Sequence, residues 1–323
     1  MNINPINQID FYKTDHRRQY PEGTNMIFSN FTARKSRIEG IDKIVFFGLQ
    51  YFLKEYLIKQ WNEEFFLKTK ESVLSMYKSR IENSLGKNKI TFEHIEKLHD
   101  LQYLPIEIKS LSEGSLVSIR CPCLVIFNTH SDFFWLTNYL ETILSCSIWG
   151  STTSATIAYE YKKLLNKYAD ETVGNQDFVK FQGHDFSFRG MFGMEAACMS
   201  GAGHLLSFVG TDTVPAIDFL EEYYYADSNK ELIGTSVPAT EHSVMCLGSK
   251  ENEIDTVVIG KNDGWKQKVN IGKKNNQNFV CIPFESFIAK LFYKCEDNGI
   301  NFITTEESYT SKASFIDFDD FNL

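Results

Sequence analysis

The fold is decided by FVKFQGHDFSF at residues 178–188, which leads into a helical pattern of small residues, MEAACMSGAGHLLSF, at 194–208. The same succession follows at once, because FVGTDT at 208–213 leads into VPAIDFLEEYYYA at 214–226. A third strand-like stretch, GTSVPATEHS, occupies 234–243. Strands that alternate with helices are typical of a parallel sheet covered by helices. The sequence therefore predicts an α/β fold built from βα units.

One polar residue stands at each predicted turn from strand to helix. These residues are Asp185, Asp212 and His242, and they lie 27 and 30 residues apart. A βα unit of a parallel barrel or a doubly wound sheet takes roughly that many residues. The turns after parallel strands gather on one face of such folds, where active sites form. We therefore expect these three side chains to converge on a shared pocket.

The pattern of units does not continue to the end of the chain. A closed barrel needs about eight βα units in roughly 250 residues, and only 81 residues follow His242. Residues 259–279 are rich in Gly, Asn and Lys, 282–299 form one amphipathic helical pattern, and 300–309 form one strand pattern. We expect the barrel to be left open or to be completed by another polypeptide.

Composition restricts the partners of this protein. The net charge is −9, and an acidic chain argues against non-specific binding to nucleic acid or to anionic membranes. The seven cysteines show no CxxC spacing, which favours free thiols in a reducing cytoplasm over a disulfide or zinc framework. The most apolar stretch, IVFFGLQYFLKEYL at 44–57, is too short to span a bilayer and is interpreted as a buried helix. We therefore expect a soluble cytoplasmic protein.

Seven short motifs, in this order, resemble the nicotinamide phosphoribosyltransferase family. The motifs are DFYKTDHRRQYP, FFGLQYFLKEYL, LPIEIKSLSEG, WLTNYLETIL, HDFSFRG, GTDTV and SVPATEHS, and they fall between Asp10 and about Ile254. GTDTV alone could be a turn in any α/β protein, but seven collinear motifs over some 245 residues are a specific signal.

The resemblance implies a type II phosphoribosyltransferase fold, an N-terminal α+β portion followed by an irregular α/β barrel. It implies a homodimer with active sites at the subunit interface. The implied reaction joins nicotinamide to phosphoribosyl diphosphate, with Mg²⁺, and yields nicotinamide mononucleotide and diphosphate for NAD biosynthesis. ATP is implied as a further cofactor, through phosphorylation of His242. Such a reaction needs positioning and charge neutralisation more than an acid–base pair.

The family motifs place three residues in the pyridine pocket. Phe186 and Tyr12, the latter from the partner subunit, resemble the two rings that enclose the pyridine, and Asp212 resembles the aspartate that accepts from the nicotinamide amide. His184 is a weaker candidate for the site, without an assigned role. Without the motifs Phe186 would be a core aromatic, Tyr12 a surface tyrosine and Asp212 an N-cap of the following helix.

The phosphate side of the site is assigned in the same way. Arg189 resembles the arginine that contacts diphosphate, Arg34 one that reaches a phosphate across the dimer, and His242 the histidine beside the diphosphate, while Asp10 is a weaker candidate. A guanidinium fork suits a phosphate well. The alternatives are a structural ion pair for Arg189, a solvated charge for Arg34 and a structural role for His242.

Later motifs of the family are missing, namely an IRPDSG-like strand end and a Gly-rich turn that would hold the 5′-phosphate. From about Asp255 the stretches IDTVVIGKNDGWKQKVNIGKKNNQNFV, IPFESFIAKLFYKCEDNGI and TEESYTSKASF instead resemble an internal segment of the RuvC-like domain of TnpB-type transposon-associated RNA-guided nucleases. We therefore expect an N-terminal α+β portion over 1–150, the first βα units of an incomplete barrel over 151–254, and an unrelated small α/β tail over 255–323. This implies a truncated transferase with impaired activity; the alternative is an inactive chimera whose tail binds nucleic acid.

Overall fold

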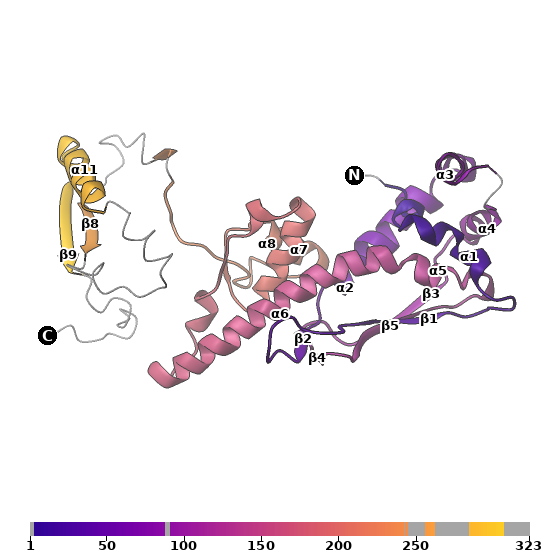
Figure 1. Ribbon diagram of the computed structural model, residues 1–323, viewed down its shortest axis with the longest axis horizontal. Coiled ribbons are helices and arrows are strands. Elements are labelled where there is room, and N and C mark those ends of the chain that lie inside the picture. The colour runs from indigo at the N-terminus through magenta and orange to yellow at the C-terminus, as the bar shows by residue number, and fades with distance from the viewer. Residues whose placement is uncertain (1–2, 88–90, 242, 245–255, 262–283, 307–323) are drawn as a thin grey trace, which may run out of the picture. The chain divides into compact units, whose positions relative to one another are not determined.

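The computed structural model describes residues 3–87, 91–241, 243–244, 256–261 and 284–306 (Figure 1). The chain forms two compact units, Met1–Ser236 and Val237–Leu323. The boundary expected near Ile254 lies outside the described residues.

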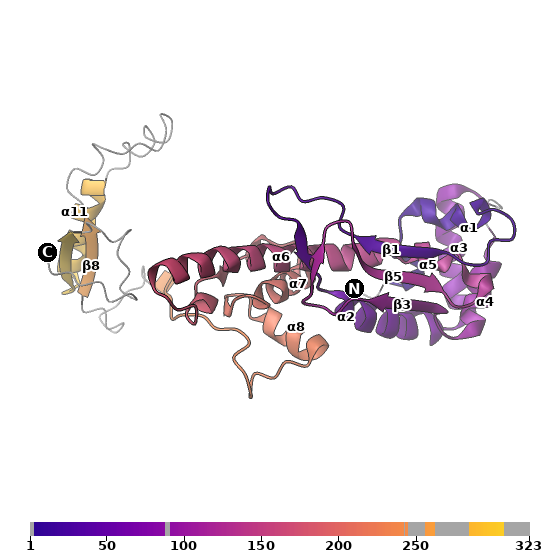
Figure 2. The same cartoon turned by 90° about the horizontal axis from the view of Figure 1, so that it is seen from below.

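A three-stranded antiparallel sheet underlies the first unit. Its central strand is β5 (Pro122–Asn128), which pairs with β1 (Phe28–Thr32) on one side and with β3 (Ile106–Ser110) on the other. Figures 1 and 2 show the helices of this unit on one face of the sheet. Leu124 and Ile126 of β5 are buried, as expected for a strand that has one covered face. A second, two-stranded sheet pairs β2 (Lys43–Val45) with β4 (Leu116–Ser118).

The stretch expected to be one helix over 44–57 is divided at Gly48. Ile44 and Val45 belong to strand β2, and the helical part begins with α2 (Leu49–Tyr51). Gly48 has a φ of 108° and would place a Cβ atom 3.0 Å from Cβ of Ser151. Only glycine adopts this conformation without strain. The expectation was therefore wrong before Gly48 and is confirmed after it.

The remaining helices of the N-terminal part cover the sheet and build the largest core. Helix α2 continues in π-helical form as η3 (Phe52–Gln60) and η4 (Asn62–Phe66). The other elements are the short η1 (Pro5–Asn7), η2 (Phe11–Asp15), α1 (His16–Gln19), α3 (Lys70–Leu85), α4 (Glu93–Leu101), η5 (Ser131–Phe133) and α5 (Leu136–Tyr139). Phe46, Phe52, Phe65, Ile95 and Leu136 are fully buried in this core.

The 32-residue helix α6 (Glu141–Thr172) runs from the sheet to the βα units. It has a length of about 48 Å. Helix α7 (Met194–Leu205) packs directly against its middle, where a Cβ on Gly203 would lie 2.8 Å from the carbonyl oxygen of Ser151. Ser154 Oγ also donates to the carbonyl oxygen of Ser200 at 2.6 Å. The small residues of α7 therefore allow two helix backbones to touch.

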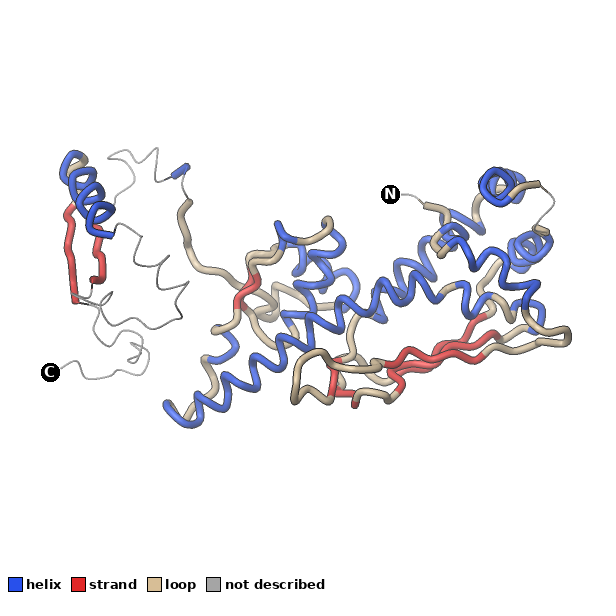
Figure 3. The backbone as a smooth tube through the Cα atoms, in the orientation of Figure 1, coloured by secondary structure: helices blue, strands red, loops and turns tan. Residues whose placement is uncertain are grey.

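The predicted succession of strand, turn and helix is confirmed for two units. Strand β6 (His184–Asp185) pairs in parallel with β7 (Gly210–Thr211), and α7 and α8 (Pro215–Tyr224) follow them. Gly210 also forms a parallel bridge with Thr235. Figure 3 shows these short strands beside α6 and its neighbours. Two further short helical turns, η6 (Val179–Phe181) and η7 (Phe188–Gly190), flank β6.

The second unit contains one parallel βαβ element. Strand β8 (Thr256–Lys261) pairs with β9 (Asn301–Glu306), and α11 (Phe284–Asp297) lies between them in the chain. The helix and strand expected over 282–299 and 300–309 are confirmed at Phe284–Asp297 and Asn301–Glu306, and residues 282–283 and 307–309 lie outside the described residues. Cys295 is buried, and the rings of Phe292 and Phe302 meet edge to face at 5.7 Å. Among the helices that the structure describes, none is long and apolar enough to cross a membrane.

Candidate active site

The turn after β6 is fixed by the buried carboxylate of Asp185. Its Oδ1 accepts from the backbone N–H of Ser187 at 2.9 Å, and its Oδ2 accepts from Thr213 Oγ1 at 2.6 Å. Burial raises the pKa of this carboxyl, but the hydrogen bonds from Ser187 and Thr213 outweigh it and leave the pKa below its usual value. Asp185 therefore stays ionised and joins the turn after β6 to the turn after β7.

The turn after β7 presents Asp212 to solvent. Its backbone N–H donates to the carbonyl oxygen of Asp185 at 2.9 Å. Its Oδ1 accepts from His184 Nε2 at 2.8 Å and from Ser236 Oγ at 2.7 Å. The hydrogen bonds from His184 and then Ser236 hold the pKa of the Asp212 carboxyl below its usual value, and the charge of Arg189 acts in the same direction. The side chain is 49 % exposed, so a carboxylate with one unshared oxygen faces the solvent.

An aromatic ring lies beside this carboxylate. The ring of Phe186 stacks on the imidazole of His184, with centroids 4.4 Å apart and an interplanar angle of 27°. Phe186 is nevertheless 68 % exposed, because His184 covers only one of its faces. Since Asp212 holds His184, the hydrogen bond also fixes the ring that supports Phe186. The free face of Phe186 is suited to a flat, electron-poor heterocycle.

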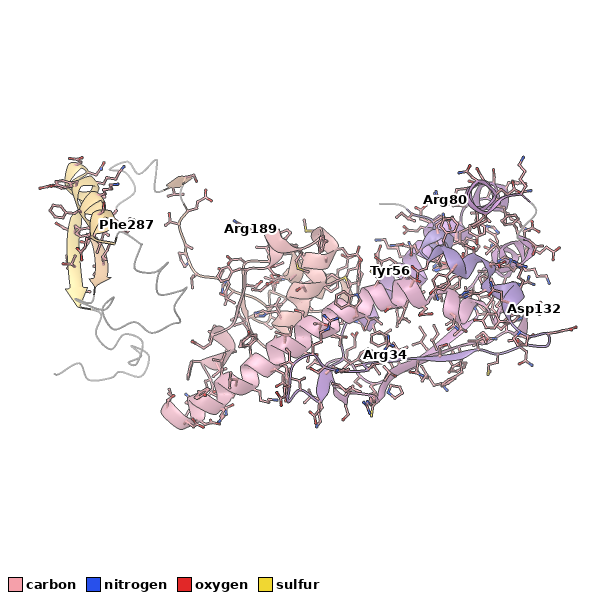
Figure 4. All side chains as sticks on the ribbon, viewed as in Figure 1. Arg34, Tyr56, Arg80, Asp132, Arg189 and Phe287 are labelled. Atoms are coloured by element: carbon pink, nitrogen blue, oxygen red, sulfur yellow. The ribbon has the colours of Figure 1, made fainter. Side chains whose placement is uncertain are left out.

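Arg189 and Ser236 complete the group. Arg189 lies in η7, on the same side of α6 as α7 and α8 (Figure 4). Ser236 follows Thr235, the residue that forms the third parallel bridge, and our sequence analysis did not select it. Its position directly after a strand-like residue, in SVPATEHS, was the available signal. His242, which was expected at this turn, lies outside the described residues.

Three other expected residues lie away from this group within the protomer. Asp10 accepts from Thr142 Oγ1 at 2.7 Å, so it sits at the first turn of α6, whereas α7 packs against α6 at Ser151 and beyond. Tyr12, in η2, is 59 % exposed and its ring lies 4.9 Å from that of His16. Arg34 follows β1, is exposed, and is drawn on the opposite side of α6 from Arg189 in Figure 4.

The arrangement offers binding groups of three kinds at the ends of adjacent parallel strands. Phe186 supplies an aromatic face, Asp212 an acceptor and Arg189 a cation. Together they can bind a planar ring that carries a hydrogen-bond donor and, beside it, an anionic group. In the described part of the chain no cluster of three or more His, Cys, Asp or Glu side chains could hold a metal ion.

Two protein families match separate parts of the chain. The family described as nicotinamide phosphoribosyltransferase, N-terminal domain, matches residues 4–108. The nicotinate phosphoribosyltransferase family matches residues 181–285, which include β6, β7 and the turns that follow them.

Curated relatives agree with these matches. A nicotinamide phosphoribosyltransferase of Acinetobacter baylyi is 57 % identical over 259 residues, which cover 79 % of this chain and 51 % of the relative. Proteins of the same name from Xanthomonas campestris and Mycoplasma genitalium are 31 % and 30 % identical, each over 76 % of this chain and over 49 % and 54 % of their own lengths. The chain thus spans about half the length of the curated relatives it matches.

Among solved structures, human nicotinic acid phosphoribosyltransferase superposes with a TM-score of 0.46 at 17 % identity, over 75 % of this chain and 40 % of that chain. A score at this level does not assign a fold. The sequence matches, by contrast, include every motif that builds the group around Asp212. Over residues 4–108 and 181–285, the chain is therefore similar to the nicotinamide and nicotinate phosphoribosyltransferase families.

Proposed function

We propose that this protein binds nicotinamide and phosphoribosyl diphosphate and transfers the phosphoribosyl group to the pyridine nitrogen. The C–O bond from the ribose carbon to diphosphate breaks, a C–N bond to nicotinamide forms, and diphosphate leaves with its electron pair. The products are nicotinamide mononucleotide, a precursor for NAD biosynthesis, and diphosphate. The observation that carries this proposal is the convergence of His184, Phe186 and Asp212 at the ends of two parallel strands, with the charge of Arg189 acting on Asp212.

Nicotinamide would occupy the free face of Phe186. Its carboxamide N–H groups would donate to Oδ2 of Asp212, because Oδ1 already accepts from His184 and Ser236. A ring held on both sides places its nitrogen at a fixed point, and such positioning is a large part of catalysis in group transfer. Tyr12 of a second copy would form the opposite wall.

The diphosphate would lie beside Arg189, with Arg34 of a second copy adding positive charge and His242 next to it. The two guanidinium groups would neutralise the charge that develops on the leaving group. Mg²⁺ would arrive with phosphoribosyl diphosphate, since Mg²⁺ is commonly held by substrate phosphates and one or two carboxylates. Both oxygens of Asp185 are engaged by Ser187 and Thr213, and Oδ2 of Asp212 would accept from the carboxamide, so the phosphates of the substrate would hold the Mg²⁺. Coupling to ATP through phosphorylation of His242 is a further proposal.

The transferase assay separates this proposal from a binding-only protein. The full chain is incubated with nicotinamide, phosphoribosyl diphosphate and Mg²⁺, and nicotinamide mononucleotide is measured by chromatography. We expect the product from the wild type and a loss of at least tenfold in Asp212→Asn. Asp218→Asn is the matched control, because Asp218 is an exposed carboxylate on α8 outside the group. A wild type that forms no product would refute the transfer, and binding of nicotinamide without product would indicate a binding-only protein.

We further propose a cytoplasmic homodimer with shared sites. It is supported by Tyr12 and Arg34, which are exposed and lie apart from the group around Asp212 in one protomer. This proposal is tested by mixing two variants, Tyr12→Ala and Asp212→Asn, each inactive alone. Refolded together, they should regain activity, because one of the two sites in a mixed dimer contains both Tyr12 and Asp212. Absence of recovery, with dimers shown by light scattering, would exclude a shared site.

The second unit supports a separate proposal. The parallel element β8–α11–β9 agrees with an α/β tail of the kind expected from the TnpB-type resemblance. If that resemblance reflects a fusion, sequencing across codon 254 in an independent isolate should show the same junction. Retention of the full chain on single-stranded RNA at physiological salt would favour a nucleic-acid role for this tail, whereas its acidic composition leads us to expect none.

A further inference from the structure

A small polar cavity lies beneath the segment that carries Tyr12, away from the group around Asp212. It has a volume of about 10 Å³ and is lined by residues from three separate parts of the chain. Arg17 comes from α1, His94 from α4, and Trp135 stands directly before α5. His94 and Trp135 are only 4 % and 3 % exposed.

Three buried polar atoms at this cavity have no hydrogen-bond partner among the described residues. They are Nε of Arg17, Nδ1 of His94 and Nε1 of Trp135. Six such atoms occur in the described part of the chain, so half of them line one cavity. Each buried polar group without a partner destabilises the folded state. Their common location indicates one shared partner rather than three separate defects.

Other polar groups that line the cavity are already engaged. Lys13 Nζ pairs with Glu141 at 2.7 Å, Thr14 Oγ1 donates to the carbonyl oxygen of Phe11 at 2.7 Å, and Tyr139 OH donates to the carbonyl oxygen of Ile6 at 2.6 Å. These groups cannot turn to satisfy the three atoms without giving up their own bonds.

We propose that the cavity binds a single water molecule that accepts from Arg17 Nε–H and Trp135 Nε1–H and donates to His94 Nδ1. A cavity of about 10–15 Å³, measured for a water-sized probe, is the smallest that holds one water, and such a water needs two to four polar partners. Arg Nε–H and Trp Nε1–H can only donate, so the ligand must accept from both.

His94, the third partner, distinguishes a bound water from a bound halide ion. Burial, and then the charge of Arg17, lower the pKa of His94 to about 3, so the imidazole is neutral, and in the tautomer that we propose, with the proton on Nε2, Nδ1 carries the lone pair. Water can donate to that lone pair, whereas a halide cannot. The edge-to-face contact of His94 with Trp135, at 4.8 Å and 87°, keeps the two rings together at the cavity. The water would connect α1 to α4 and α5 and so hold in place the short segment that presents Tyr12.

A crystal structure of the full chain tests the site directly. We expect one density peak at roughly 2.7–3.2 Å from each of the three nitrogens. Crystals grown in bromide should show no anomalous peak there. A dry cavity in a well-ordered map would overturn the proposal, and an anomalous bromide peak would replace the water by a halide.

A solution measurement removes the dependence on crystals. The chain has four tryptophans, so ¹⁵N-labelled tryptophan gives a simple indole spectrum. We expect a cross-relaxation peak from the Trp135 indole proton to a long-lived bound water, and its loss in His94→Phe, which removes the acceptor and places a ring carbon toward the cavity. Trp149→Phe, at an exposed indole, should leave that peak unchanged. Absence of the peak in the wild type would overturn the proposal, and so would its persistence at full intensity in a folded His94→Phe.

Discussion

Thr213 donates a hydrogen bond of 2.6 Å to the buried carboxylate of Asp185 and thereby joins the turns after two adjacent parallel strands. Thr213 is fully buried. The backbone N–H of Asp212 reinforces the connection through its bond to the carbonyl oxygen of Asp185. The two turns that carry Phe186 and Asp212 are therefore held in one relative position by a pair of residues that need not touch a substrate.

We predict that Thr213→Val lowers the free energy of unfolding by about 1.5–3 kcal/mol, because the ionised Asp185 loses a buried donor. Valine has nearly the same shape as threonine, so packing is retained. Thr213→Ser, which keeps the hydroxyl, should cost less. Urea denaturation of the three proteins measures the difference, and equal midpoints for Val and Ser would show that the hydroxyl contributes nothing.

The lowered pKa of Asp185 predicts a dependence of stability on acid. The folded pKa lies below the unfolded value of about 4, so the folded state gains stability above pH 4 and loses it as the pH falls through the folded pKa. Asp185→Asn removes this titration, and its free energy of unfolding should change less between pH 5 and about pH 2 than that of the wild type. Parallel acid profiles of the two proteins would reject the assignment.

We predict that Gly203→Ala disrupts the contact between α6 and α7. The new methyl group would lie 2.8 Å from the Ser151 carbonyl oxygen and 3.0 Å from the Ala155 nitrogen, and backbone atoms cannot move aside. We expect a loss of about 1–3 kcal/mol. Gly150→Ala is the control. Gly150 lies in α6, and a Cβ there would meet nothing within 4 Å. This substitution should raise the free energy of unfolding by about 0.5–1 kcal/mol. Thermal melts should move in opposite directions.

Ser236→Ala tests the residue that sequence analysis did not select. Loss of its hydrogen bond to Asp212 should weaken nicotinamide binding by roughly twofold to fivefold, because the bond is exposed and worth no more than about 1 kcal/mol. Stability should hardly change. Isothermal titration with nicotinamide measures the affinity. An unchanged affinity would show that His184 alone positions Asp212.

The βα units could be predicted because their signal is local. Strand residues, a polar turn and a helical pattern recur at a fixed spacing, and Asp185 and Asp212 are found where that spacing places them. The division of residues 44–57 into a strand and a helix at Gly48 could not be predicted from a local pattern. The conformation of Gly48 depends on its contact with Ser151, more than 100 residues away, and no local pattern contains that information.

Of the candidate site, the spacing predicted only Asp212. His184, Phe186 and Arg189 were assigned by the family resemblance, and they lie near Asp212 because they belong to the neighbouring strand and turn. Ser236 reaches Asp212 because the preceding residue, Thr235, forms a parallel bridge with Gly210. This pairing cannot be predicted from the residues around Ser236 alone. Tyr12 and Arg34 are placed near a pyridine or a phosphate only by the family resemblance.

Helix α6 contributes side chains to two hydrophobic cores of the first unit. Leu144 and Ile148 contribute to the core beneath the sheet, and Ala155 contributes to the core beneath α7 and α8. A continuous helix cannot lose order in its middle without releasing side chains from both cores. Calorimetry of the full chain should therefore show one cooperative heat-absorption peak for Met1–Ser236. A substitution that destabilises the core at the sheet should then lower the melting temperature of the βα units as well.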